Sequence, residues 1–320
     1  AAGNKAVRKL DANGNEIWSK TDVSNGYSIA VDSAGNVYVA HNVAAGGKVV
    51  RKLDANGNEI WSKTDVDYGY GIAVDSAGSV YVGYGNGLGS KTVRKLDING
   101  NEIWSKTDVS NGYGIAVDSA GNVYVAHNVA AGYKAVRKLD ANGNEIWSKT
   151  DVSNGYSIAV DSAGNVYVAH YVAAGNKAVR KLDANGNEIW SKTDVSNGYS
   201  IAVDSAGNVY VAHNVAAGGK VVRKLDANGN EIWSKTDVDY GYSIAVDSAG
   251  SVYVAHCISA GKAVRKLDIN GNEIWSKTDV SNGYGIAVDS AGNVYVAHNV
   301  AAGGKAVRKL DGNKYYQIVG

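Results

Sequence analysis

The chain has 320 residues with 40 Gly, 21 Tyr and 7 Trp but no Phe, Pro or Met, a composition best explained by one short unit copied many times. Hydrophobic residues make up 45% and charged residues 20%, which excludes a disordered chain, and no apolar run is long enough to span a bilayer. The 32 Lys and Arg nearly cancel the 31 Asp and Glu and are spread evenly, which excludes a basic face for nucleic acid.

The repeat unit is defined by its tryptophans, which recur every 43 residues with one interval of 42, at positions 18, 61, 104, 147, 190, 233 and 275. One unit, residues 22–64, reads DVSNGYSIAVDSAGNVYVAHNVAAGGKVVRKLDANGNEIWSKT. A period of this length with four strand-like segments is typical of a β-propeller blade.

The segments of this unit follow in chain order. Residues 27–32 alternate bulky and small side chains, and residues 37–41 are β-branched and aromatic, so we expect two strands joined by the turn DSAGN. Residues 49–54 and 59–63 form a second hairpin through an Asn-Gly turn. No segment has the 3.6-residue period of a helix, so the chain is predicted to be all-β.

The sequence therefore predicts a seven-bladed β-propeller with four antiparallel strands per blade, closed by pairing of the chain termini. We expect a single domain over residues 1–320, with blades near 22–64, 65–107, 108–150, 151–193, 194–236, 237–278 and 279–320. The VRKLD strand occurs eight times, so the last blade has two candidate closing segments, residues 5–20 and residues 305–319. We favour the first, because Trp18 keeps the outer-strand pattern and the C-terminal YYQIV departs from it.

The segment NGYSIAVDSAGNVYVAHN, followed by AVRKLDANGNEIW, resembles the blades of NHL-type and related bacterial seven-bladed propeller repeats. The segment LDANGNEIW also resembles quinoprotein-like propellers, in which the Trp packs between blades. The resemblance implies the fold over the whole chain, with functions that range from binding platforms and lectin-like modules to lyases and structural modules. It implies no quinone, because the vicinal cysteine pair is missing, and no cofactor is expected. Residues 3–70 and 175–242 are identical, which indicates recent amplification of the blades.

The candidate ligand contacts lie on the face that carries the HNVAAGGK and TDVSNGY loops, where the repeats differ most. They are His41, His127, His170, His213, His256 and His298, then Tyr27, Tyr70, Tyr113, Tyr156, Tyr199, Tyr242 and Tyr284, and Asn42 with its equivalents. The histidines are expected about one blade apart, too far to share a metal ion, and the alternative is that each bonds a neighbouring backbone carbonyl.

Other side chains have structural interpretations beside functional ones. The Asp that ends each inner strand, Asp32 and its copies, either attracts a cation at the channel mouth or caps its own turn. The DANGN loops lack the later acidic ligand of a calcium site. Trp18 is expected between blades, and Arg8 is expected to stack on an aromatic ring or to pair with an Asp across blades. Cys257 is interpreted as a free thiol, and a single Cys excludes an internal disulfide.

The function expected from the sequence is a non-enzymatic scaffold or multivalent binding module, with similar sites repeated around one face. Its partner would be a glycan, a repetitive surface polymer or a protein, with no nucleic acid, no membrane insertion, no catalytic residue and no metal, and the chain would be a monomer. One alternative is a propeller lyase or hydrolase with a single metal-assisted site near blade 2 or blade 6. Another is an engineered or recently amplified propeller without a small ligand. The chain begins without Met, as a trimmed chain would, and its location is left open with a lean towards the bacterial cell surface or exterior.

Overall fold

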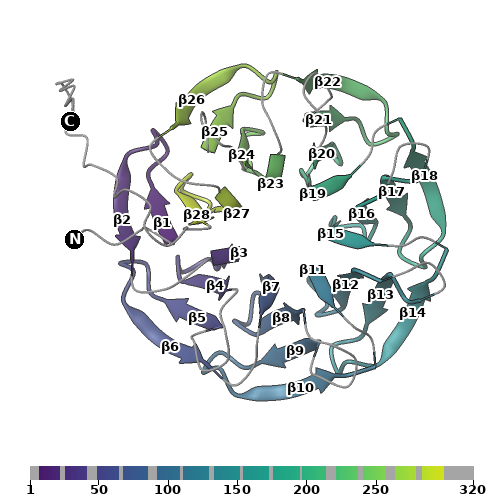
Figure 1. Cartoon of the computed structure of the whole chain (residues 1–320), viewed down its shortest axis with the longest axis horizontal. Helices are drawn as coiled ribbons and strands as arrows, with labels where there is room; N and C mark the ends of the chain where they lie inside the picture. The colour runs from purple at the N-terminus through teal and green to yellow at the C-terminus, as the bar shows by residue number, and fades with distance from the viewer. Residues whose placement is uncertain are drawn as a thin grey trace, which may run out of the picture.

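The computed structural model describes residues 7–21, 26–41, 49–64, 68–85, 92–108, 111–129, 133–151, 154–172, 176–194, 197–213, 221–236, 241–256, 264–278 and 283–298. Within these residues 28 strands form seven four-stranded sheets, which stand as blades around a central axis (Figure 1). The described residues include no helix long and apolar enough to cross a membrane. The predicted all-β, seven-bladed propeller is confirmed.

The strands fall into four classes, counted outwards from the axis, and blades 1 to 7 are numbered from the chain order of their innermost strands. The innermost strands are β3 (Gly26–Val31), β7 (Gly69–Val74), β11 (Gly112–Val117), β15 (Gly155–Val160), β19 (Gly198–Val203), β23 (Gly241–Val246) and β27 (Gly283–Val288). The second strands are β4 (Val37–His41), β8 (Val80–Tyr84), β12 (Val123–His127), β16 (Val166–His170), β20 (Val209–His213), β24 (Val252–His256) and β28 (Val294–His298). The third strands are β5 (Val50–Leu53), β9 (Val93–Leu96), β13 (Val136–Leu139), β17 (Val179–Leu182), β21 (Val222–Leu225), β25 (Val264–Leu267) and β1 (Val7–Leu10). The outermost strands are β6 (Glu59–Lys63), β10 (Glu102–Lys106), β14 (Glu145–Lys149), β18 (Glu188–Lys192), β22 (Glu231–Lys235), β26 (Glu273–Lys277) and β2 (Glu16–Lys20).

The first hairpin of each blade turns around an aspartate. Asp32 Oδ1 accepts hydrogen bonds from the backbone N–H groups of Ala34 and Asn36, at 3.0 and 2.8 Å, and Gly35 has a φ of 79°. Glycine adopts this left-handed conformation at little cost, so the sequence DSAGN specifies the turn. Asp11 binds its own turn in the same way in the DANGN loop. Both carboxylates therefore cap their turns, and for Asp32 this confirms the structural interpretation of the sequence.

The ring is closed by the N-terminal hairpin. β1 pairs antiparallel with β28, with Val7 opposite Ala297, and β2 pairs with β1. The resulting order β2-β1-β28-β27 places the first and last described strands in one sheet (Figure 1). The expected closure through the N-terminal hairpin is confirmed, and the other candidate segment, residues 305–319, lies outside the described residues.

Trp and Lys side chains fasten each blade to the next. Trp18 Nε1 donates a hydrogen bond to the backbone oxygen of Ala55 at 3.0 Å, and Lys9 Nζ donates to the same oxygen at 3.3 Å. The Lys9 ammonium also lies 5.2 Å from the centre of the Tyr295 ring, a favourable cation–π contact. All seven blades repeat this arrangement. The predicted place of the tryptophans between blades is confirmed.

The arginine of each third strand is buried and bound by acidic or aromatic groups. Arg137 donates to both carboxylate oxygens of Asp108, at 3.1 and 2.9 Å, and its Nε donates to Glu145 at 2.9 Å. Asp108 lies in the connection that arrives from blade 2, so this ion pair links two blades. In blade 2 the guanidinium of Arg94 lies 5.9 Å from the centre of the Tyr84 ring. Both predicted partners of this arginine, an Asp and an aromatic ring, therefore occur, in different blades.

Candidate functional site: a tyrosine ring on the axis

A β-bulge near the start of each innermost strand directs one tyrosine towards the axis. In β3, Gly26 lies opposite His41 and Ser28 lies opposite Ala40, so Tyr27 between them has no partner across the ladder. A bulged residue escapes the strict alternation of side chains along a strand, so its side chain need not point at a neighbouring blade. Each of the other six innermost strands has the same register shift.

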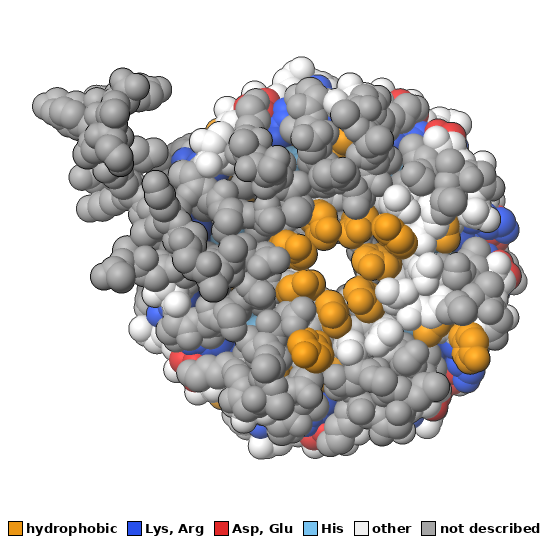
Figure 2. Space-filling model, in the orientation of Figure 1, with side chains coloured by type: hydrophobic (Ala, Val, Ile, Leu, Met, Phe, Trp, Pro, Cys, Tyr) orange, Lys and Arg blue, Asp and Glu red, His pale blue; other side chains and the backbone are white. Residues whose placement is uncertain are grey.

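The seven bulged tyrosines gather around one cavity of ≈ 260 Å³ at the mouth of the channel, where Figure 2 shows a circle of hydrophobic side chains. They are Tyr27, Tyr70, Tyr113, Tyr156, Tyr199, Tyr242 and Tyr284. Neighbouring ring centres lie between 4.4 and 5.3 Å apart, and Tyr284 contacts Tyr27 at 4.9 Å, so the circle is closed. Aromatic pairs at such distances contribute about 0.5–1.5 kcal/mol each beyond their buried area. The structure therefore brings all seven predicted tyrosines together into one composite site, and we call this set the tyrosine ring.

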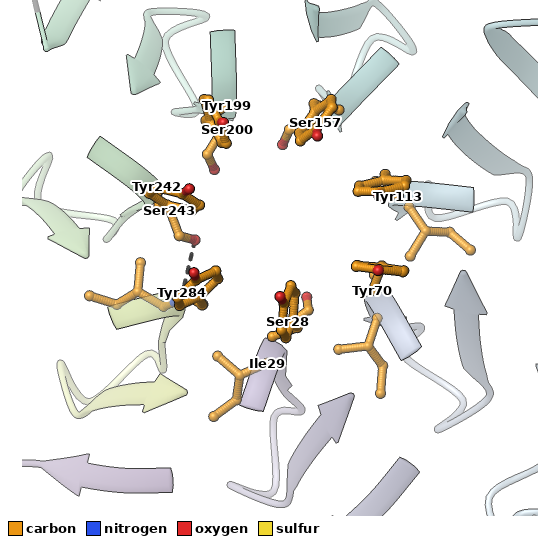
Figure 3. A pocket seen from close by; sticks show the side chains of 18 of the residues that line it. Ser28, Ile29, Tyr70, Tyr113, Ser157, Tyr199, Ser200, Tyr242, Ser243 and Tyr284 are labelled. Carbon is orange, nitrogen blue, oxygen red and sulfur yellow. Dashed lines mark hydrogen bonds between the residues drawn. The ribbon is translucent and has the colours of Figure 1, made fainter. Parts of the chain in front are cut away.

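A second, smaller cavity of ≈ 150 Å³, which we call the polar belt, adjoins the first along the channel and shares its seven tyrosines (Figure 3). The residue after each tyrosine lines it, and this residue is Ser28, Gly71, Gly114, Ser157, Ser200, Ser243 or Gly285. Ser157 Oγ accepts a hydrogen bond of 3.2 Å from the backbone N–H of Ile201 in the next blade. The same bond joins the next two blade pairs. These serines therefore connect neighbouring blades and make the channel wall polar.

Two phenols of the tyrosine ring, those of Tyr70 and Tyr156, have raised pKa values. Burial raises the pKa of Tyr70, and the neighbouring Tyr113 raises it further. Burial is also the largest cause that raises the pKa of Tyr156, and the neighbouring Tyr113 and Tyr199 raise it further. Both hydroxyls stay protonated at neutral pH, so they can donate and accept hydrogen bonds but are poor bases.

Three further tyrosines on the same face were not selected as site residues from the sequence. Tyr171 is 37% exposed, and its ring centre lies 5.3 Å from that of Tyr156 and 5.5 Å from that of Tyr199. Tyr68 is 41% exposed and Tyr133 is 63% exposed. Each of them replaces the residue that most blades have at its position, and this difference between repeats could have marked them as site residues in the sequence.

The predicted histidines have a different environment. All six side chains are buried, and they are not among the residues that line the tyrosine cavity or the polar belt. Asn42 and Cys257 lie outside the described residues. Within the described ranges, no group of three His, Cys, Asp or Glu residues is gathered as a metal ion would require. The tyrosines, and not the histidines, thus form the candidate site.

The fold and this site define a β-propeller scaffold with a single aromatic site on its axis. The chain belongs to the family described as outer membrane protein assembly factor BamB, whose model matches residues 89–313, more than half of the chain. The specific resemblance to NHL-type blades stays a prediction.

Solved structures of similar shape share little sequence with the chain. A protein of unknown function from Bacteroides caccae has a TM-score of 0.54 and 13% identity over 80% of this chain and 94% of that chain. A chain of the mitotic checkpoint complex has a TM-score of 0.67 and 13% identity over 91% and 93%. The computationally designed Ika8 protein has a TM-score of 0.60 and 14% identity over 86% and 96%. At these identities the likeness shows the fold alone. No curated protein matches the chain.

Proposed function

We propose that the chain is a non-enzymatic binding scaffold that holds a protein partner on the face formed by the tyrosine ring. The closed circle of seven tyrosines at the channel mouth is the observation that carries the proposal. Tyrosine is enriched at protein interfaces because it supplies a large, rigid contact area and a hydrogen-bonding hydroxyl at a low cost in conformational entropy. The circle is already packed, so little ordering is needed when a partner arrives.

The description of the family supports a protein partner over a glycan or a surface polymer. It names a factor for the assembly of outer membrane proteins, which is a task carried out on other protein chains. The same description supports a binding role over the alternative of a propeller without any ligand.

The chemistry of the site supports binding over catalysis. The described residues that line the two cavities are Tyr, Ser, Gly and Ile, and they include no carboxylate or imidazole that could activate a serine. The phenols of Tyr70 and Tyr156, with raised pKa values, are unsuited to act as general bases at neutral pH.

The geometry also changes the expected stoichiometry. Seven repeated loops suggested up to seven similar sites, but the tyrosines contact one another around one axis. We therefore propose one partner per chain, in place of multivalent binding.

A photo-crosslinking amino acid placed at Tyr156 tests the proposal, with the same group at Ala77 on the opposite face as the matched control. In extract from the source cells, we expect a protein adduct at position 156 that excess unlabelled chain suppresses and that position 77 does not give. Equal adducts at both positions, or none, would contradict the proposal. Specific binding to a glycan array without a protein adduct would favour the lectin-like alternative instead.

A further inference from the structure

We propose that the partner segment bound on this face is an extended, proline-containing peptide that lies along a track of tyrosines. The track consists of Tyr68, Tyr70, Tyr113, Tyr156 and Tyr171 and crosses blades 2, 3 and 4. This inference rests on the proposed function, because it names the kind of segment that the protein partner presents.

Ring contacts join four of the five tyrosines of the track. Tyr70 stacks on Tyr113 with ring centres 4.4 Å apart, Tyr113 contacts Tyr156 at 4.8 Å, and Tyr156 contacts Tyr171 at 5.3 Å. At the other end the N–H of Gly85 donates to the backbone oxygen of Tyr68 at 3.0 Å, and a Cβ on Gly85 would lie only 1.9 Å from the Tyr70 ring. The Tyr68 phenol is close enough to Tyr70 to raise its pKa, so Tyr68 lies beside the tyrosine ring. Exposed Tyr68 and Tyr171 therefore extend the tyrosine ring outwards at both ends of the arc.

Tyr68 is held in a backbone conformation that disfavours it. Its φ is 51°, and the residues at the same position in blades 3, 4 and 5 are Asn111, Asn154 and Asn197, with φ between 50° and 52°. Asparagine tolerates this left-handed region, whereas a bulky aromatic residue there is an outlier. Strained residues cluster at sites that bind ligands, so this outlier at an exposed position supports a ligand contact at Tyr68.

The chemistry of the track fits a polyproline II helix better than a charged ligand. Such a segment has no internal hydrogen bonds and exposes its backbone carbonyls, and aromatic grooves with hydrogen-bond donors are the usual sites that bind it. The track offers aromatic rings and phenol hydroxyls, and no formal charge lines the two axial cavities in the described part of the chain. A cation or an anion would find no opposite charge there to offset its loss of water.

Titration calorimetry of the full chain with an acetylated, amidated peptide of ten prolines tests the inference, with a Gly-Ser peptide of equal length for comparison. We expect the proline peptide to bind one per chain and the Gly-Ser peptide not to bind. The variants Tyr68→Asn and Tyr171→Asn introduce residues that other blades have at these positions, so both should fold. Each is expected to weaken binding about ten-fold, as the loss of an interface anchor does. Tyr133→Gly, also a residue of other blades and outside the track, should bind like the wild type.

Equal affinity for the two peptides, or no binding of the proline peptide at millimolar concentration, would overturn the inference. So would an unchanged affinity of both track variants when circular dichroism shows them folded. These results leave the proposed function standing if the crosslinker at Tyr156 still captures a protein. Loss of that adduct removes the proposed function and, with it, the basis of this inference.

Discussion

Tyr70 and Tyr113 stack face to face on the axis, with ring planes at 16°, whereas Tyr27 meets Tyr70 edge to face at 88°. The backbone beneath explains the difference, because blade 2 has two glycines where blade 1 has Ser28 and Ala40. A Cβ on Gly71 would lie 2.3 Å from the backbone oxygen of Tyr113, and one on Gly83 would lie 2.6 Å from that of Gly112. The two glycines allow blade 2 to approach blade 3, and this close approach brings the two tyrosine rings into a parallel stack.

Gly71→Ser is therefore expected to destabilise the folded propeller, although serine stands at this position in four blades. The new Cβ meets a backbone oxygen that moves only with its whole strand, so we expect a loss of about 1–3 kcal/mol in the free energy of unfolding. Urea unfolding checks the loss. Gly285→Ser is the matched control, because its Cβ would lie 2.9 Å from the backbone oxygen of Tyr27 and should cost less. Equal losses in the two variants would contradict this explanation.

Tyr68→Asn should stabilise the protein while it weakens binding. The left-handed φ of 51° disfavours tyrosine by about 1 kcal/mol, and asparagine relieves most of this cost. Asn111→Tyr is the reverse change at the same position of the next blade and should lower stability by a similar amount. Thermal unfolding of both variants checks the sign of the change in stability. A Tyr68→Asn variant that melts below the wild type would contradict the claim that the backbone of Tyr68 is strained.

Ser79→Asn should give Asp75 in the first turn of blade 2 a further hydrogen bond, while it removes the weaker bond between the Ser79 hydroxyl and Tyr81. In blade 1 the Nδ2 of Asn36 donates to Asp32 Oδ2 at 2.9 Å, and Ser79 stands at the position of Asn36. The added bond is expected to contribute about 0.5–1 kcal/mol to the free energy of unfolding. Asn36→Ser should remove a similar amount from blade 1. The denaturant midpoint should rise in Ser79→Asn and fall in Asn36→Ser. Any other pair of results would show that this bond adds no net stability.

The stability of the propeller should fall steeply in acid. Burial opposes ionisation of Asp32, Asp118 and Asp161, but hydrogen bonds from the turn and from a neighbouring tyrosine outweigh it and lower the pKa of each carboxyl. The folded pKa lies below the unfolded value of about 3.9, so this stabilisation is present above that pH and is lost as the pH falls through the folded pKa. Calorimetric melting temperatures should be level from pH 7 to pH 5 and drop below about pH 4. A melting temperature that stays constant down to about pH 2 would exclude this linkage.

The sequence by itself determined the local structure of each blade. Alternating bulky and small residues specified the strands, and DSAGN specified its turn because Asp32 caps it and Gly35 takes the positive φ. The tryptophan period gave the number of blades, and the resemblance of LDANGNEIW to quinoprotein-like propellers implied the place of Trp18 between blades. These features depend on neighbours in the chain or on identical neighbouring blades, so one unit contains the information for them.

The tertiary structure decided the features that depend on how the units meet. Residues 5–11 and 305–311 have the same sequence. Only the assembled sheet shows that the first segment pairs with β28 on one side and, on the other, with β2, which contains Glu16 and Trp18. The sequence made the histidines and the tyrosines candidate ligand contacts alike, yet packing buries the histidines and the bulge turns the tyrosines to the axis. Seven copies of one residue became a single site because ring closure brings together side chains that lie 43 residues apart, and no repeat considered alone contains that geometry.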